Sequence, residues 1–306
     1  MQKTLEIKSV TQTHKLLGLA APKHPLVTVI DAQAYEGQPV FKEIKVVMDM
    51  YRITLKSSNY KGYIKYGRNS YDYEEGTLIF SAPGQVMEYG SETEPEPVDA
   101  IKGWTLAFHP DLIRKHPLSK KISQYSFFNY DVTEALHLSD NERRIIEELI
   151  EKVVVEYSQN LDQHSQHLII SNIELLLDYC LRFYDRQFYT RTNFNSDIVS
   201  KFEKLLISHY QSDSLKEHGM PTVGYFGKAM NVSPHYLSDL LKKETGMTAK
   251  EQIHLFIINK AKNSLLNSAK SISEIGYELG FEYPQHFSNL FKSKTGYSPS
   301  EFRNHN

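Results

Sequence analysis

The sequence is poor in cysteine and contains no long apolar run. Cys180 is its single cysteine in 306 residues, so no disulfide can form within the chain, and a reducing compartment such as the cytoplasm is expected. No stretch of about 18 apolar residues is present, so no transmembrane helix and no membrane partner are predicted. The first 15 residues also lack the apolar segment that a secretory signal needs.

Motifs typical of enzymes are missing as well. There is no P-loop, no dinucleotide-binding fingerprint and no GxSxG. A cupin metal site usually needs two histidines spaced HxH, and that spacing occurs nowhere. His164 and His167 are three residues apart but stand among Gln and Ser, and we interpret them as solvated. We therefore predict no catalytic residue, no metal and no cofactor, and expect a protein that is not an enzyme.

Charge does not identify a nucleic-acid partner. The formal net charge is −2 for the whole chain. Residues 195–306 contain 13 Lys and Arg against 11 Asp and Glu, whereas residues 1–194 contain 22 against 26. A net of +2 is small for a DNA-binding domain. The prediction of function has to come from sequence patterns.

The first third of the chain has the composition of β-strands. Segments 44–55, 61–67, 76–84 and 104–108 are rich in β-branched and aromatic residues and are separated by glycine and proline. Short strands at this spacing predict a β sandwich or barrel, here over residues 1–135, with the acidic segment 91–99 as a solvated loop. A small effector could bind inside it. No ligand residue can be assigned, because Tyr51, Tyr63 and Tyr66 are equally well explained as core aromatics.

Residues 136–185 are predicted to form a pair of helices. Ser139 and Glu142 have capping-box spacing ahead of a periodic apolar run, and a second run extends from 163 to 184. The second run has two apolar stripes: Ile169, Ile173, Leu176 and Cys180, and Ile170, Leu177, Leu181 and Tyr184. The second stripe either completes a two-helix core or contacts another subunit in a homodimer. The polar segment 186–195 lacks periodicity and is interpreted as a linker to a domain at 196–306.

The C-terminal domain contains an internal repeat. Residues 232–251 align with residues 282–301 at an offset of 50, with seven identities in twenty positions. The identical pairs are Pro234/Pro284, Ser238/Ser288, Leu240/Leu290, Lys242/Lys292, Thr245/Thr295, Gly246/Gly296 and Glu251/Glu301. The same structural unit therefore occurs twice.

Each copy has the pattern of a helix, a tight turn and a second helix. In the first copy, a helix at 222–230 precedes a turn at Asn231, and Ser233 caps a helix that starts with Pro234 and ends at Gly246. In the second, the first helix starts at Ser271 or Ser273, the turn contains Gly280, and the second helix extends from Pro284 to Gly296. The small residues Gly227 and Gly276 are expected where the two helices of each copy approach closely. This is the pattern of a helix-turn-helix.

A long amphipathic helix is predicted between the copies, from about 249 to 267. At about 1.5 Å per residue it would measure roughly 27 Å, whereas successive major grooves on one face of DNA lie about 34 Å apart. A rigid rod of this length could hold both second helices against one face of a duplex. This geometric match links the repeat to DNA.

Residues 262–303 resemble the signature of the AraC/XylS family of transcription regulators. The matching residues include Ile275-Gly276, Gly280-Phe281, Phe287-Ser288, Phe291-Lys292 and Gly296-Tyr297-Ser298-Pro299 before Phe302-Arg303. The resemblance implies an α+β protein with an N-terminal cupin-like β domain and two following helices, then an all-α domain with two helix-turn-helix units joined by a long helix. It also implies a cytoplasmic bacterial regulator whose N-terminal domain senses a signal or dimerises, with double-stranded DNA and RNA polymerase as partners.

The second helix of each unit would read the DNA. If the leucines at 237, 240 and 241 face the core, the same period leaves four residues outward, and Phe287, Leu290 and Phe291 do the same in the second unit. The predicted DNA-binding residues are His235, Ser238, Asp239 and Lys242, and Gln285, Ser288, Asn289 and Lys292. Asn and Gln can bond adenine, and Lys can bond phosphate or guanine. Asp239 departs from the neutral or basic residues usual in the family.

We expect a sequence-specific DNA-binding transcription regulator that responds to a small effector or a partner. An alternative is a scaffold or ligand-binding protein that uses the helical repeat for protein contacts and does not bind DNA. Steep salt dependence of DNA binding would separate the two functions.

Overall fold

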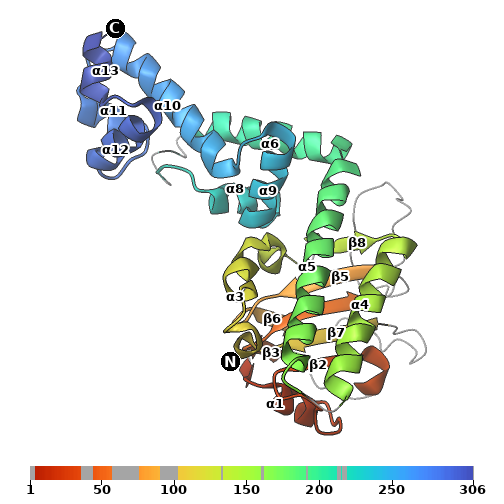
Figure 1. The fold of residues 1–306 in the computed structure, drawn as a ribbon. Helices are drawn as coiled ribbons and strands as arrows, with labels where there is room; N and C mark the ends of the chain where they lie inside the picture. Colours follow the sequence, from red (N-terminus) through yellow and green to blue (C-terminus); the bar gives the residue numbers. More distant parts are fainter. Residues whose placement is uncertain are drawn as a thin grey trace. The chain divides into compact units, whose positions relative to one another are not determined.

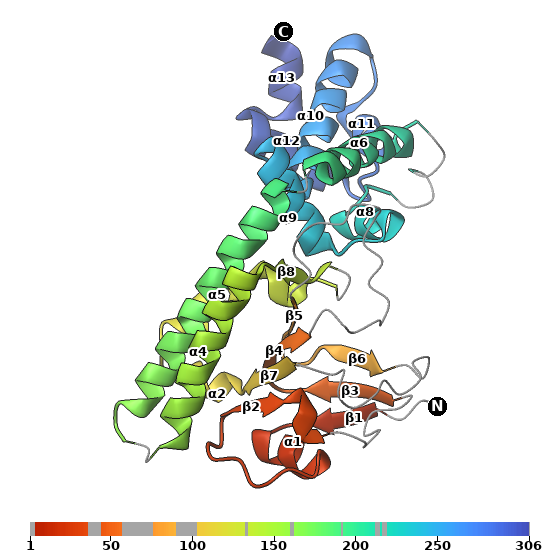
Figure 2. The ribbon, with the colours of Figure 1, turned by 90° about the vertical axis from the view of Figure 1, so that its right-hand side faces the viewer.

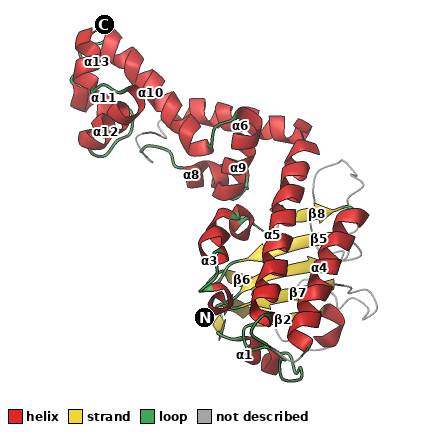
Figure 3. Cartoon of the chain, in the orientation of Figure 1, coloured by secondary structure: helices red, strands yellow, loops and turns green. Residues whose placement is uncertain are grey.

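The computed structural model describes residues 4–35, 44–56, 76–89, 103–131, 134–159, 162–190, 192–211, 215 and 219–305. The chain divides into two compact units, residues 1–190 and residues 191–306. The first contains two β-sheets followed by two long helices, and the described part of the second is helical (Figures 1 and 3). The predicted α+β fold class is confirmed.

The first unit is built on two sheets. The larger has the order β2 (Val27–Asp31), β7 (Gly103–Phe108), β4 (Tyr51–Lys56), β5 (Gly76–Ser81), β8 (Leu136–Leu138), all antiparallel. The smaller has the order β1 (Thr4–Ile7), β3 (Ile44–Met48), β6 (Val86–Tyr89), with β1 and β3 parallel. Figure 2 shows the larger sheet between the long helices and the smaller sheet.

Strand alternation divides the larger sheet into two faces. On β4, Ile53 and Leu55 are buried, and their cross-strand neighbours include Leu106 and Phe80. This face packs against the long helices, since the Phe80 ring lies 6.0 Å from the ring of Tyr184. The other face of β4 carries Arg52, Thr54 and Lys56. A hydrophobic cluster of Ile7, Val10, Val46, Met48, Met50 and Ala107 lies on that side.

The β-strand predictions were correct in kind but incomplete. The segment 44–55 forms two strands, β3 and β4, which belong to different sheets because the chain turns at Asp49 and Met50. The sequence did not predict β1, β2, β8 or the helix α1 (Val10–Leu16). The segments 61–67 and 91–99, with Tyr63 and Tyr66, lie outside the described residues. Tyr51 is half-buried, and its ring stacks 5.2 Å from that of Phe108.

Short helices follow β7 before the chain enters the long pair. They are α2 (Pro110–Ile113) and α3 (Leu118–Lys121), together with the 3₁₀ turns η3 (Ile122–Gln124) and η4 (Ser126–Asn129). The 3₁₀ turn η1 (Ala32–Tyr35) follows β2 at the opposite end of the larger sheet. His109 caps α2, and its Nδ1 accepts a hydrogen bond from the backbone N–H of Asp111 at 3.2 Å. His116 Nδ1 accepts in the same way from the N–H of Leu118. Both side chains stabilise local turns.

The long helices are α4 (Asp140–Ser158) and α5 (Ser165–Thr190). The predicted capping box is present: the Ser139 hydroxyl accepts from the N–H of Glu142, and the Glu142 carboxylate accepts from the N–H of Ser139. The helix pair packs on the larger sheet, where the Tyr157 hydroxyl accepts a hydrogen bond from Val29 N–H at 3.2 Å.

The boundary between the two compact units falls inside the predicted linker 186–195. Where it is described, this segment is helical, because α5 continues to Thr190 and the next helix, α6 (Thr192–His209), begins two residues later. Gln187 is buried despite its polarity, since its amide bonds His137 N–H and Ala135 O next to β8. In the second apolar stripe Ile170, Leu177 and Tyr184 are buried, whereas Leu181 is 41% exposed.

The second unit contains the two predicted repeats after α6. The first consists of α8 (Val223–Met230) and α9 (Pro234–Thr245), then comes the rod α10 (Ala249–Asn267), and the second consists of α11 (Ile272–Glu278) and α12 (Pro284–Thr295), followed by α13 (Pro299–His305). Ser271 is the residue that starts α11, through a capping box with Glu274. Gly246 and Gly296 end α9 and α12 with φ of 80° and 81°.

Gly227 and Gly276 lie where the helices of each repeat cross. A Cβ on Gly227 would be 2.7 Å from the carbonyl oxygen of Val232. A Cβ on Gly276 would be 3.4 Å from Phe287 and Pro284, which is tight but tolerable. The close approach therefore depends more strictly on glycine in the first repeat.

We expect Gly227→Ala to destabilise the α8–α9 pair by about 1–3 kcal/mol, because the backbone must move to accept the methyl group. The matched control is Gly224→Ala on the same helix, where the nearest atom is 3.6 Å away. It should be neutral or stabilising by up to about 1 kcal/mol, through helix propensity. Hydrogen exchange of the α8 and α9 amides in the full chain measures both effects. Equal protection in the two variants would contradict the assigned close approach.

Candidate nucleic-acid interface

The helix α9 is oriented by its buried side. Leu237, Leu240 and Leu241 are fully buried, and the Ser233 hydroxyl caps the helix by accepting from Tyr236 N–H at 3.2 Å. The opposite side carries the predicted residues: His235 and Lys242 are exposed, and Ser238 and Asp239 are half-buried. The outward placement expected from the leucine spacing is what the structure shows.

The helix α12 repeats this arrangement with differences. Phe287 and Phe291 are fully buried, whereas Leu290 is only half-buried, against the prediction that it faces the core. Gln285, Asn289 and Lys292 are exposed. Ser288 is half-buried, and its hydroxyl donates to the carbonyl of Pro284 at 3.1 Å, so its proton is used within the helix.

The N-terminus of α12 differs from that of α9. Tyr283 stands at the capping position, and its side chain makes no capping hydrogen bond. Its ring is 55% exposed and lies 5.5 Å from the ring of His286. Tyr297, after the helix, is 52% exposed. These tyrosines are not among the predicted DNA-binding residues, although the repeat alignment pairs them with Ser233 and Met247 and so indicates where the copies differ.

The two repeats share an electrostatic environment at the start of α10. The pKa of Glu251 is lowered, mainly by hydrogen bonds from Thr248 and further by the positive charges of Lys294 and Lys242. The pKa of His254 is lowered by burial and by Lys250 and Lys294. Lys242 belongs to α9 and Lys294 to α12, so both second helices bring cations to the same turns of α10. Figure 1 shows α9 and α12 on one side of that helix.

No group of three or more His, Cys, Asp or Glu that could hold a metal ion occurs among the described residues. Cys180 is buried in the helix pair, and burial raises the pKa of its thiol. Within the described part of the chain, no helix has the length and apolar character needed to cross a membrane.

A long helix that joins two helix-turn-helix units, each with a polar outward helix, defines a double helix-turn-helix protein. A profile described as a helix-turn-helix domain matches residues 226–305. The chain is 34% identical over 105 residues to the Msm operon regulatory protein of Streptococcus mutans, which covers 34% of this chain and 35% of that protein. It is 23% identical over 283 residues to the arabinose operon regulatory protein of Salmonella typhimurium, which covers 90% and 91% of the two chains.

Among solved structures, the C-terminal domain of AraT, a response regulator from Geobacillus stearothermophilus, is 28% identical with a TM-score of 0.32 and covers 36% of this chain and 85% of that one. The predicted family resemblance is confirmed for the C-terminal helix-turn-helix domain, which is of the AraC type. The match to the Msm regulator spans about a third of that relative's length.

Proposed function

We propose that the chain is a sequence-specific DNA-binding transcription regulator that acts in the cytoplasm. The observation that supports this most directly is the pair of outward helices, α9 and α12, which bring cations to the same turns of α10. In this proposal the second unit binds double-stranded DNA and presents the protein to RNA polymerase, and the first unit senses a small effector and joins two copies.

The dimensions of the second unit suit two adjacent contacts on DNA. The rod α10 has 19 residues, which at about 1.5 Å per residue gives roughly 28 Å. Major grooves on one face repeat at about 34–36 Å. Two helix pairs joined through a rod of this length can place their second helices in successive grooves.

The outward residues supply complementary chemistry for this role. Gln285 and Asn289 are exposed and can bond adenine through paired amide groups. Lys242 and Lys292 are exposed cations that suit phosphates or guanine. Asp239 would be repelled by phosphates but could accept from the amino group of cytosine. We therefore assign stronger DNA contacts to the second repeat than to the first.

The test is binding of the full chain to a duplex selected from a random pool, measured over a series of salt concentrations. We expect affinity to fall steeply as salt rises, because phosphate contacts release counterions. Lys292→Gln should reduce the salt slope by about one unit, and Asn289→Ala should cost about 1–3 kcal/mol and relax preference at one base pair. Lys120→Gln, an exposed lysine of the first unit, is the control. No duplex binding at low salt would favour the scaffold function.

An effector site is proposed on the face of the larger sheet that points away from the long helices. Arg52 and Lys56 lie two alternations apart on β4, with the Thr54 and Thr105 hydroxyls 3.1 Å apart between the strands. Arg52 Nε donates to the Ser81 hydroxyl at 3.1 Å. Burial lowers the pKa of Lys56, and the charge of Arg52 lowers it further. A ligand that carries an anionic group would gain charge-assisted hydrogen bonds from these two side chains.

Thermal unfolding with a hexose phosphate and with the same free hexose tests this site. We expect the phosphate alone to raise the melting temperature, because a ligand that binds only the folded state stabilises it. Arg52→Gln should abolish the increase, and Lys15→Gln, an exposed lysine on α1, should keep it. An equal response to both sugars, or a full response in Arg52→Gln, contradicts an anionic effector.

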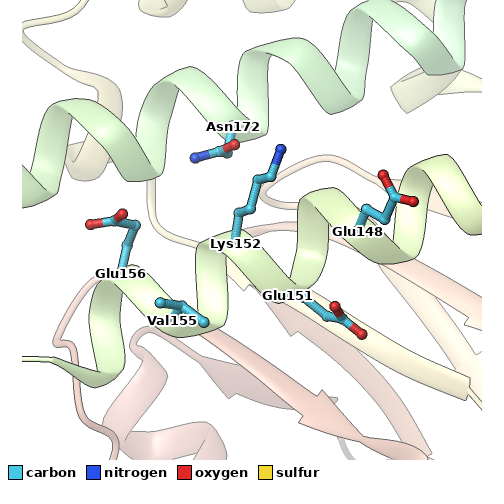
Figure 4. Close-up of a pocket in the computed structure, with 6 residues that line it drawn as sticks. All are labelled: Glu148, Glu151, Lys152, Val155, Glu156 and Asn172. Carbon is cyan, nitrogen blue, oxygen red and sulfur yellow. The ribbon is translucent and has the colours of Figure 1, made fainter.

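A homodimer is proposed through the outer side of α4 and α5. Val155, Leu168 and Leu175 are 51%, 42% and 46% exposed. On α5 the two leucines lie one turn on either side of Asn172, whose amide donates to Leu168 O at 2.8 Å. An open pocket of about 440 Å³ lies between the helices (Figure 4) and is lined by Glu148, Glu151, Lys152, Val155, Glu156 and Asn172. The same surface on a second copy could cover these side chains about a two-fold axis.

Sedimentation of the full chain at micromolar concentration tests the dimer. We expect a dimer for the natural sequence and a monomer for Leu175→Glu, because a buried, unpaired carboxylate opposes association. Leu255→Glu on α10 is the control, since Leu255 is equally exposed at 46% but belongs to the other unit. A monomeric natural chain, or a dimeric Leu175→Glu variant, is the result that rules out this interface.

A further inference from the structure

The two helix-turn-helix units touch at a point other than the rod. Residues 219–221 lead into α8 and so belong to the first repeat, while Gly280 forms the turn between α11 and α12 of the second repeat. The backbone N–H of Met220 donates to the carbonyl of Gly280 at 2.9 Å. The second repeat is therefore attached to the first repeat by a direct hydrogen bond in addition to α10.

Glycine makes this contact as close as it is. Gly280 has φ of 87°, and a Cβ there would lie 2.7 Å from Met220 N, 2.8 Å from Leu215 Cδ1 and 2.9 Å from the carbonyl carbon of Gly219. A Cβ on Gly219, whose φ is 66°, would lie 3.4 Å from the carbonyl oxygen of Gly280. The backbone at Gly219 and Met220 therefore contacts the backbone at Gly280 directly, because glycine has no Cβ to keep the two segments apart.

His209 holds Gly219 from the other side. It is the last residue of α6 and is 1% exposed. Its Nε2 lies 3.0 Å from the carbonyl oxygen of Gly219. Since a carbonyl oxygen only accepts, Nε2 carries the proton and donates. The imidazole ring also meets the ring of Tyr225 on α8 edge-on, at 4.9 Å between centroids. Gly219 is thus held against α6 and α8 of the C-terminal unit.

The far end of the rod is secured as well. Arg303 on α13 donates from Nε to Leu265 O at 3.1 Å and from Nη2 to Lys270 O at 2.8 Å. These bonds fasten the last turn of α10 and the start of the second unit to α13. A body attached at one point can rotate about it, whereas attachment at two separate points removes that freedom.

We propose that the contact of Gly219 and Met220 with Gly280, called here the 219–280 contact, is a positioning element that sets the spacing at which α9 and α12 engage DNA. His209 is its supporting residue. The inference depends on the proposed DNA-binding function and deepens it: the chain accepts one separation of its two half-sites. Without the contact, the second repeat could turn about the end of α10 and follow half-sites at other separations.

Gly280→Asn tests the contact, with Gly296→Asn as a matched control. Both glycines have left-handed φ, of 87° and 81°, and asparagine tolerates that conformation. A Cβ at Gly296 meets nothing within 4 Å, whereas one at Gly280 meets the Met220 and Gly219 backbone. The two substitutions thus carry similar local strain, but only Gly280→Asn pushes the two repeats apart at the 219–280 contact.

The measurement compares full-chain binding to the selected duplex with binding to the same duplex carrying one inserted base pair between its halves. The insertion shifts one half by about 3.4 Å and turns it by about 35°. We expect it to weaken binding by at least about tenfold in the natural chain and in Gly296→Asn, and by less than about threefold in Gly280→Asn. Binding to a duplex with one half scrambled should be the same in Gly280→Asn as in the natural chain. An unchanged tenfold penalty in a folded Gly280→Asn overturns the proposal.

Two further measurements keep the result interpretable. If Gly280→Asn does not fold, His209→Phe replaces it, because phenylalanine keeps the ring and loses the donor, and His209→Gln, which keeps an Nε2 donor, should restore the spacing penalty. Amide exchange at Met220 needs no DNA: it should be slow in the natural chain and in Gly296→Asn, and fast in Gly280→Asn. Equal exchange in all three overturns the contact, whereas failure of the natural chain to bind DNA with slow exchange at Met220 overturns only the proposed function.

Discussion

The close approach of α8, at Gly227, to the turn that leads into α9 is the constraint on which the first repeat depends. A methyl group there would meet the Val232 carbonyl at 2.7 Å, so any larger residue forces α8 and α9 apart. The crossing places Leu237, Leu240 and Leu241 in the core. Because a helix has 3.6 residues per turn, burial of these three leaves His235 and Lys242 outside. The candidate interface on α9 therefore consists of the residues that the packing of its leucines leaves exposed.

The second repeat satisfies the same requirement with less strict packing. Gly276 has more room than Gly227, and Leu290 is half-buried where Leu240 is fully buried. Asn289 replaces Asp239, which removes a negative charge from the outward face. The copies have therefore kept one backbone arrangement while their exposed faces have diverged. Two unequal contacts on DNA are the physical consequence.

In the first unit, polar side chains attach the helix pair to its neighbours, while some apolar side chains of that pair remain exposed to solvent. Arg186 bonds the Glu142 carboxylate at 2.6 Å and the His137 carbonyl at 2.7 Å, which fastens the end of α5 to α4 and β8. Lys121 bonds both Glu174 and Asp178 of α5. These contacts use residues that look like surface groups in the sequence, whereas Leu168 and Leu175 remain exposed. Hydropathy therefore ended α5 too early, at residue 184 instead of Thr190, but it identified the buried stripes of that helix apart from Leu181.

Local patterns were sufficient wherever structure depends on neighbours in the chain. The caps at Ser139, Ser233 and Ser271, the turns at Gly246 and Gly296, and the outward face of α9 follow from spacing of a few residues. Tertiary structure alone decided the division of 44–55 between two sheets and the contact between Met220 and Gly280. Those features join residues that are distant in sequence, and nothing within a helical turn or a strand alternation encodes which distant backbone a residue will meet.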